Sequence, residues 1–253
     1  MEKTKITSAQ NPIIKKFSTF NRKKTPDLIR LDGTHLHLEY FKATGKNAET
    51  TLVSERFVNS ADWENFKHLE NLVEIPNDLM TKLSPSKSPA GILSLVSKPH
   101  VPSVVEKNLV VVLESIQDPG NLGTMLRTSL AMGVSEVLLL GENVDIWNDK
   151  ALRAGMGAQF YLSVSSIADL KNWKQNFSGS LIGTSLQGSS SWETTLDQKT
   201  ALIFGNEGQG LSLESQKLCD STIKIPMQPN AESLNVASSL AILTHEWARQ
   251  NKS

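Results

Sequence analysis

The sequence predicts an α/β protein in two parts, a C-terminal domain built on a parallel sheet and a smaller α/β domain before it. In the second part, apolar strand-like runs alternate with helix-like segments, which is typical of a parallel sheet with helices on both faces. In the segment 97–108, Pro99 and Pro102 lie among polar residues, so we place the linker there. The predicted domains are therefore 1–100 and 108–253.

The first domain is expected to be compact, with about 70 to 90 residues, which is an ordinary domain size. Its predicted helix spans His35–Ala43. Its predicted strands are Leu52–Val53, Leu72–Ile75 and Ile92–Val96.

The second domain is expected to hold six strands, each read from a short apolar run. They are Leu109–Leu113, Val137–Leu140, Tyr161–Val164, Leu181–Thr184, Leu202–Phe204 and Thr222–Ile225. Ligands of parallel sheets bind at the carboxyl ends of the strands, so the loops that follow these runs are the candidate site.

The loop after the first of these strands opens a helix. Asp118-Pro119-Gly120 precedes it, and Asn121 is the expected N-cap. Gly123 and Arg127 are four residues apart and share a helix face, so the glycine is expected to leave room beside the guanidinium.

A glycine-rich loop, G-N-E-G-Q-G-L, follows the strand Leu202–Phe204 and carries one carboxylate, Glu207. Glycines let a backbone approach a ligand closely. The loop lacks the Lys-Ser/Thr ending of a Walker loop, and G-M-G-A-Q-F at Gly155 lacks the third glycine of a dinucleotide fingerprint. Both observations disfavour a nucleotide-phosphate enzyme, which stays an alternative.

The segment from Ile225 to Trp247 joins a strand end, a polar loop and an amphipathic helix. Pro226 stops the strand, and Ser233 is expected to cap the helix. Leu234, Ala237, Ala241, Thr244 and Trp247 recur at helical spacing and predict one buried stripe. Any α/β protein can contain such a segment, so alone it does not establish a site.

Together the three loops carry N-L-G-x-x-x-R, then G-N-E-G-x-G-L, then I-P-M followed by S-L-N-V. In this order they resemble the three motifs of SPOUT-class RNA methyltransferases, and specifically of the SpoU/TrmH branch. The segments around Lys15, Asp32 and Ser86 resemble the small substrate-binding domain of rRNA-directed members. Asp32 stands where glutamate is more usual, and Pro229 lies in a loop that often carries glycine.

The resemblance implies an RNA 2′-O-ribose methyltransferase that uses S-adenosylmethionine, with a trefoil knot in the sheet and a homodimeric assembly. It implies that the first motif of one subunit reaches the cofactor pocket of the other, and the apolar face of the C-terminal helix, ending at Trp247, is the expected interface. Large-subunit rRNA is the expected substrate; tRNA, an antibiotic-resistance role and a catalytically silent RNA-binding relative stay open.

The resemblance also assigns roles to individual residues. The catalytic and ribose-facing set is Arg127, Asn121, Glu207, Ser233 and Asn235, and the cofactor-binding set is Thr184, Gly205, Ile225, Met227 and Leu234. Guanidinium stays protonated in proteins, so Arg127 is expected to clamp a phosphate and stabilise the developing alkoxide instead of accepting a proton. The competing readings are a surface ion pair of Arg127 with Asp118 or Glu114, a solvated loop acid for Glu207 and a plain helix cap for Ser233.

Charge is unevenly distributed along a chain whose net charge is zero. Residues 1–30 hold eight Lys or Arg against two acids, a net charge of +6, and so form a candidate phosphate-contacting arm. The candidate RNA-binding residues are Lys15, Lys16, Arg22, Lys23 and Lys24. A merely solvated terminus is the alternative.

The remaining composition argues against other classes of protein. One cysteine, Cys219, excludes an internal disulfide and fits a reducing cytoplasm. The histidines show no metal-ligand spacing apart from His35-x-His37, which is expected to alternate faces, so no metal is expected. The chain lacks an apolar run of the roughly 18 to 20 residues that a membrane span needs.

Overall fold

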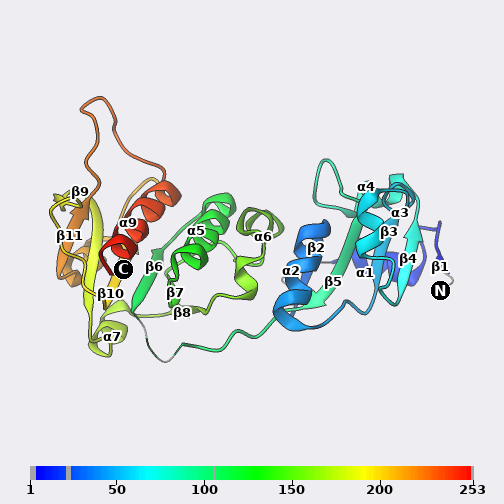
Figure 1. Ribbon diagram of the computed structural model, residues 1–253, viewed down its shortest axis with the longest axis horizontal. Coiled ribbons are helices and arrows are strands. Elements are labelled where there is room, and N and C mark those ends of the chain that lie inside the picture. The colour runs from blue at the N-terminus through cyan, green and yellow to red at the C-terminus, as the bar shows by residue number, and fades with distance from the viewer. Residues whose placement is uncertain (1–3, 21–23, 105, 107, 252–253) are drawn as a thin grey trace. The chain divides into compact units, whose positions relative to one another are not determined.

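The computed structural model describes residues 4–20, 24–104, 106 and 108–251. Contacts between Cα atoms divide the chain into two compact units, Met1–His100 and Val101–Ser253. Figure 1 shows the elements of each unit. Within the described residues, no helix is long and apolar enough to cross a membrane.

The N-terminal unit is a five-stranded mixed sheet with the order β1-β4-β3-β5-β2. Strands β1, β4 and β3 are parallel, and β5 runs antiparallel to both β3 and β2. The strands are β1 (Thr4–Lys5), β2 (Leu28–Asp32), β3 (Thr51–Ser54), β4 (Leu72–Ile75) and β5 (Ile92–Ser97). The helices are α1 (Pro12–Ser18), α2 (Thr34–Thr44), α3 (Glu55–Val58), the 3-10 turn η1 (Ala61–Asn65) and α4 (Asn77–Leu83).

The predicted strands of this unit and the predicted helix are present, and the structure adds β1, β2, α1, α3 and α4. Strand β2 was not predicted because it lacks a continuous apolar run: Arg30 interrupts it, and side chains on one face only contribute to the core. His35 is exposed and His37 is buried, so the pair does alternate faces.

The C-terminal unit is a six-stranded sheet with the order β11-β9-β10-β6-β7-β8, and every neighbouring pair is parallel. The strands are β6 (Leu109–Glu114), β7 (Glu136–Leu140), β8 (Val164–Ile167), β9 (Ser180–Ser190), β10 (Thr200–Phe204) and β11 (Ser221–Lys224). The parallel sheet is confirmed, and the knot stays a prediction. One strand was misplaced: the run Tyr161–Val164 follows the 3-10 turn η2 (Ala158–Phe160), and β8 begins only at Val164. Leu162 is buried in the core of the unit without being part of a strand, so an apolar residue at this position resembles a strand residue.

Helices cover both faces of this sheet. Helices α5 (Pro119–Met132) and α9 (Val236–Asn251) lie side by side on one face, where the core includes Leu122, Met125 and Leu240 (Figure 1). Helices α7 (Leu170–Gln175) and α8 (Leu213–Leu218) bury apolar residues on the other face, and α6 (Asp149–Gly155) packs on α5. Half-buried Cys219 follows α8, and burial raises the pKa of its thiol to about 11.

The two predicted helix caps were wrong by a few residues. Helix α5 is capped by Asp118, whose Oδ1 accepts the N–H of Asn121 at 2.8 Å, so the Asn121 side chain is left for other contacts. Helix α9 begins after Asn235, whose Oδ1 accepts the N–H of Ala237 at 2.9 Å, while Ser233 stays in the preceding loop. Each loop contains several cap-forming side chains, and the entry direction of the chain selects one.

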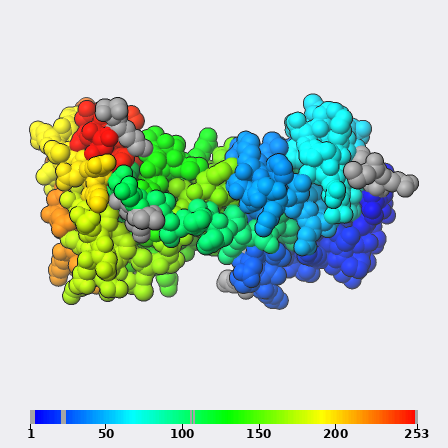
Figure 2. Space-filling model, turned by 60° about the horizontal axis from the view of Figure 1, so that its bottom comes forward, coloured from blue at the N-terminus to red at the C-terminus, as the bar shows by residue number. Residues whose placement is uncertain are grey.

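The predicted stripe on α9 also needs correction. The buried residues are Ala237, Leu240, Leu243, Thr244 and Trp247, whereas Leu234 precedes the helix and Ala241 is only half-buried. The Trp247 indole N–H donates to the carbonyl oxygen of Asp197 at 2.9 Å inside the unit's own core. This face is therefore already covered and cannot serve as the expected dimer interface. Figure 2 shows the end of α9, in red, against yellow parts of the same unit, and Gln250 near this end accepts the N–H of Leu196 in the segment that precedes β10.

Candidate active site

One cavity lies where strands β9, β10 and β11 end, at the edge of the sheet at which parallel-sheet ligands bind. Its volume is about 850 Å³, which is within the range of small-molecule sites. Its walls come from the bulged part of β9, the glycine-rich loop after β10, and the long loop between β11 and α9 (orange in Figure 1). The three predicted motif regions therefore meet at one place.

All five predicted cofactor-binding residues line this cavity: Thr184, Gly205, Ile225, Met227 and Leu234. Four of the five predicted catalytic residues line it too: Asn121, Glu207, Ser233 and Asn235. Thr184 is held toward β10 by a hydrogen bond from its hydroxyl to the carbonyl oxygen of Ile203 at 3.0 Å. Ser233 is exposed and does not cap α9, so the plain helix-cap reading of this residue is wrong.

The glycine-rich loop is closed by Asn206, a residue to which the sequence reading gave no role. Its backbone exchanges two hydrogen bonds with Gly210, at 3.1 and 2.9 Å, and its side-chain oxygen accepts the N–H of Gly208 at 2.9 Å. Its side-chain amide donates to the carbonyl oxygen of Ser115 at 2.9 Å, which ties the loop to the end of β6. The sequence does contain a signal for this role. An asparagine between glycines favours a turn in which the asparagine side chain accepts a backbone N–H two residues later.

Two glycines make this closure possible. A Cβ atom on Gly205 would lie 2.2 Å from the carbonyl carbon of Gly210, closer than any side chain can approach a backbone. Gly210 has a φ of +69°, in the left-handed region that other residues rarely adopt. At Gly205 and Gly210 the loop therefore presents backbone to the cavity.

A chain of amide and carboxylate groups crosses one side of the cavity. The Asn235 amide donates to the Asn121 side-chain oxygen at 3.0 Å, and the Asn121 amide donates to Glu207 Oε1 at 3.1 Å. Burial raises the pKa of Glu207, but this effect is outweighed by hydrogen bonds from Asn121 and from the backbone of Gln117 and Asp118, so the pKa lies below its usual value. Glu207 is thus an ionised, hydrogen-bonded carboxylate that orients Asn121, which disfavours the solvated-acid reading.

Arg127 does not reach this cavity. It is exposed on α5, and none of the described residues forms an ion pair or hydrogen bond with its guanidinium. The expected competitors have other partners: Asp118 pairs with Lys150 at 2.7 Å, and Glu114 accepts hydrogen bonds from Ser212 and Ser215. The surface ion pair is therefore not formed, and Arg127 is not among the residues that line its own subunit's cavity.

Gly123 has a different function from the one predicted. A Cβ atom there would lie 2.3 Å from the carbonyl oxygen of Ala151 and 2.7 Å from Cβ of Ala154. The glycine permits the close packing of α6 on α5, and α6 fills the space that a side chain at this position would take.

The predicted RNA-binding residues lie in the N-terminal unit. Lys15 and Lys16 are exposed on α1, and Lys24 is exposed before β2. Arg22 and Lys23 lie outside the described residues. No group of three or more metal-binding side chains occurs in the part of the chain that the structure describes.

Comparison with known proteins shows the family to which the chain belongs. Residues 108–245 match the model of the SpoU rRNA Methylase family. The chain is 30% identical to the 23S rRNA (guanosine(2553)-2′-O)-methyltransferase RlmP of Bacillus subtilis, over 95% of this chain and 97% of the relative. It is also 30% identical to the 23S rRNA (uridine(2479)-2′-O)-methyltransferase of Streptomyces viridochromogenes, over 72% of this chain and 68% of the relative.

Solved structures share the whole fold. A crystal structure of an RNA 2′-O ribose methyltransferase superposes with a TM-score of 0.85 at 29% identity, covering 98% of this chain and 99% of that one. The S-adenosylmethionine complex of AviRb from Streptomyces viridochromogenes has a TM-score of 0.81 at 23% identity, covering 95% and 98%, and shares the fold. Because the family model matches more than half of the chain and a relative is 30% identical over 95% of it, the chain belongs to the SpoU rRNA methylase family.

Proposed function

We propose that this protein transfers a methyl group from S-adenosylmethionine to a ribose 2′-hydroxyl of large-subunit rRNA. The observation that carries the proposal is that one cavity gathers Asn121, Glu207, Ser233 and Asn235 with the five expected cofactor contacts. The named activities of RlmP and of the Streptomyces relative, both 23S rRNA 2′-O-methyltransferases, support the same reaction here.

The residues present fit S-adenosylmethionine. Phe204, Ile223 and Leu243 give the cavity apolar wall suited to an adenine ring, and the glycine-rich loop adds backbone donors and acceptors. The cofactor supplies a methyl group already activated on a cationic sulfur, so the protein's part is to bind, orient and exclude water.

Within this proposal Glu207 is a positioning residue. A general base is tuned toward neutral pH, and a carboxylate with a lowered pKa is a poor proton acceptor there. Glu207 instead accepts a hydrogen bond from the side-chain nitrogen of Asn121 and so fixes the orientation of that amide. The side-chain oxygen of Asn121 then accepts a hydrogen bond from the side-chain nitrogen of Asn235. Asn121, Asn235 and Ser233 then present the polar groups that face the ribose.

The missing catalytic group leads to a proposal about assembly. We infer a homodimer in which Arg127 of one subunit completes the cavity of the other, where it clamps a phosphate and stabilises the developing alkoxide. Arg127 is exposed and without an ion pair among the described residues. Leu130, three residues on, is 39% exposed, and Ile242 on the neighbouring α9 is 41% exposed, so this outer face offers apolar surface in place of the buried Trp247 stripe.

The N-terminal unit is proposed to hold the RNA through its basic arm, since the exposed Lys15, Lys16 and Lys24 can neutralise phosphates. Arg22 and Lys23 would extend the same arm.

The decisive experiment is transfer of tritiated methyl groups to RNA from a strain that lacks the gene, followed by mapping of the modified ribose. Label in 23S rRNA is the expected result, and label in tRNA instead would change the substrate. Absence of transfer with intact RNA binding would indicate a silent relative. Calorimetry with S-adenosylmethionine, ATP and NAD tests the cofactor, and preference for either nucleotide would contradict the proposal.

A further inference from the structure

The most exposed large apolar side chain among the described residues is Trp192, which is 79% exposed. Trp192 follows β9, and residues 185–187 of that strand line the active-site cavity. An indole that is 79% exposed contributes little to the core, so its position is available for contact with a ligand.

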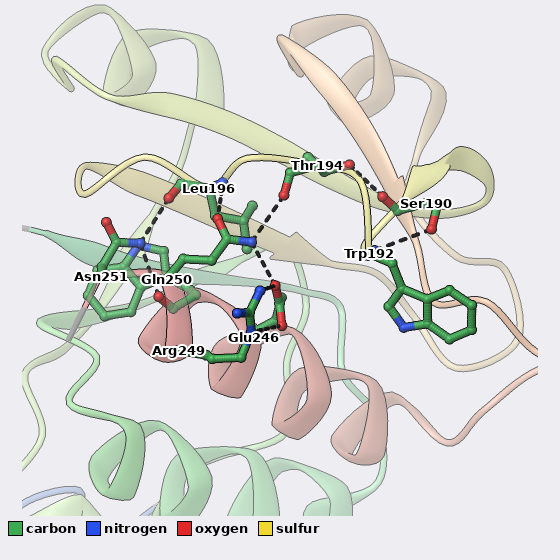
Figure 3. Close-up of polar contacts among 9 residues, drawn as sticks. Ser190, Trp192, Thr194, Leu196, Glu246, Arg249, Gln250 and Asn251 are labelled. Carbon is green, nitrogen blue, oxygen red and sulfur yellow. Dashed lines mark hydrogen bonds and ion pairs between the residues drawn. The ribbon is translucent and has the colours of Figure 1, made fainter. Parts of the chain in front are cut away.

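The turn that carries Trp192 is fixed by hydrogen bonds. Its own N–H donates to the Ser190 hydroxyl at 3.2 Å, and both the N–H and the hydroxyl of Thr194 donate to the Ser190 carbonyl oxygen, at 3.1 and 2.7 Å. Behind the turn, Gln250 of α9 accepts the N–H of Leu196 at 2.8 Å and donates to the carbonyl oxygen of Thr194 at 3.1 Å. Figure 3 shows these contacts, with the indole of Trp192 lying apart from them. The backbone that carries the indole is therefore fixed in place.

That place is beside the cavity. The N–H of Ser191 donates to the carbonyl oxygen of Lys224 at 2.9 Å, on the edge strand β11, and the next residue, Ile225, lines the cavity. Leu186 of β9, the strand that precedes Trp192, is 62% exposed and lines the cavity. An aromatic ring is thus presented at the border of the site that takes the target ribose.

A ribose 2′-hydroxyl reaches such a cavity only where the RNA strand is locally unpaired. Bases freed in this way stack on aromatic side chains, and the stacking tolerates any sequence because every base has a π-face. The residue after Trp192, Glu193, is exposed, and its negative charge disfavours a phosphate contact at this point. We propose that Trp192 stacks on an unpaired base next to the methylated nucleotide and so holds the strand at the cavity. This inference rests on the proposed function.

The test compares Trp192→Ala with Trp192→Phe, using 23S rRNA from a strain that lacks the gene. Alanine should weaken RNA binding about tenfold, within the range found for loss of one base–aromatic stack, while phenylalanine should restore most of it. Affinity for S-adenosylmethionine should not change in either variant. Leu213→Ala is the matched control, because Leu213 is 75% exposed on α8, on the other face of the sheet, and should bind RNA like the wild type.

Fluorescence gives a second readout. Acrylamide should quench the wild-type emission less when rRNA is bound, and this protection should be lost in Trp192→Phe. If the wild type methylates the RNA and Trp192→Ala binds it with the same affinity, the stacking of Trp192 is refuted and the proposed function stands. A wild type that neither binds nor methylates rRNA would overturn the proposed function with it. Conversion of Trp192→Ala to a monomer in light scattering would show that a second copy of the chain covers the indole, and would also refute stacking on RNA.

Discussion

The composite active site can be tested by mixing two inactive variants. Arg127→Ala removes an exposed side chain that has no ion pair or hydrogen bond among the described residues, so its fold should be unaffected within about 0.5 kcal/mol. Gly205→Val puts a Cβ atom 2.2 Å from the Gly210 carbonyl carbon and should deform the cavity. Each homodimer then has two identical defective sites.

Subunit exchange predicts a definite level of rescue. At equal concentrations about half of the dimers are mixed, and in a composite arrangement each has one site with an intact cavity and an intact arginine. The expected activity is therefore about a quarter of the wild-type level, read as tritiated methyl transfer to rRNA. If Arg127 served its own subunit, neither site of the mixed dimer would be intact and activity would stay at background.

A double variant provides the converse control. When Arg127→Ala/Gly205→Val is mixed with wild type, a composite arrangement leaves no working site in the mixed dimer, so about a quarter of the activity should remain, from wild-type dimers only. An arginine acting within its own subunit predicts about half. Should Gly205→Val fail to fold, Leu234→Trp fills the same cavity from an exposed loop position. A monomer in light scattering at micromolar concentration would refute the reasoning at once.

Four further outcomes are expected. Arg127→Ala should lower single-turnover methyl transfer by roughly 10² while leaving cofactor affinity nearly unchanged, and a main effect on cofactor binding in calorimetry would contradict its role. S-adenosylmethionine should bind in the micromolar range without metal, so activity should survive a chelator when the RNA is kept folded. Replacing the basic residues of the N-terminal arm by glutamine should weaken RNA binding and flatten its salt dependence. An unchanged salt slope would mean that the RNA is held elsewhere. The residues to change are Lys15, Lys16, Arg22, Lys23 and Lys24. Burial lowers the pKa of His37 from 6.5 to about 4, so the folded state disfavours the protonated imidazole. The contribution of neutral His37 to the free energy of unfolding is fully present above pH 6.5. It should fall by up to about 3 kcal/mol as the pH drops toward 4. His37→Gln should remove this pH dependence in denaturant unfolding of the N-terminal unit, and an unchanged slope would show that another group is responsible.

The sequence alone determined most of the catalytic unit. A central parallel strand is buried on both faces, so it must be an unbroken apolar run, and Leu109–Leu113 could be located from composition. The motif loops follow such strands, and parallel strands bring their carboxyl ends to one edge. That Gly205, Glu207 and Ser233 would meet there followed from the order of elements.

Tertiary structure decided what depends on relations between distant segments. Asp118 and Asn121 are both good helix caps, and only the path of the chain from β6 selects Asp118 and leaves the Asn121 side chain for Glu207. The stripe ending at Trp247 read equally well as an interface or as a core, and its burial against the sheet shows that it is core. The exposure of Arg127 and of Trp192 could not be read from neighbours in sequence, because exposure is the absence of contacts that any other part of the chain might have supplied.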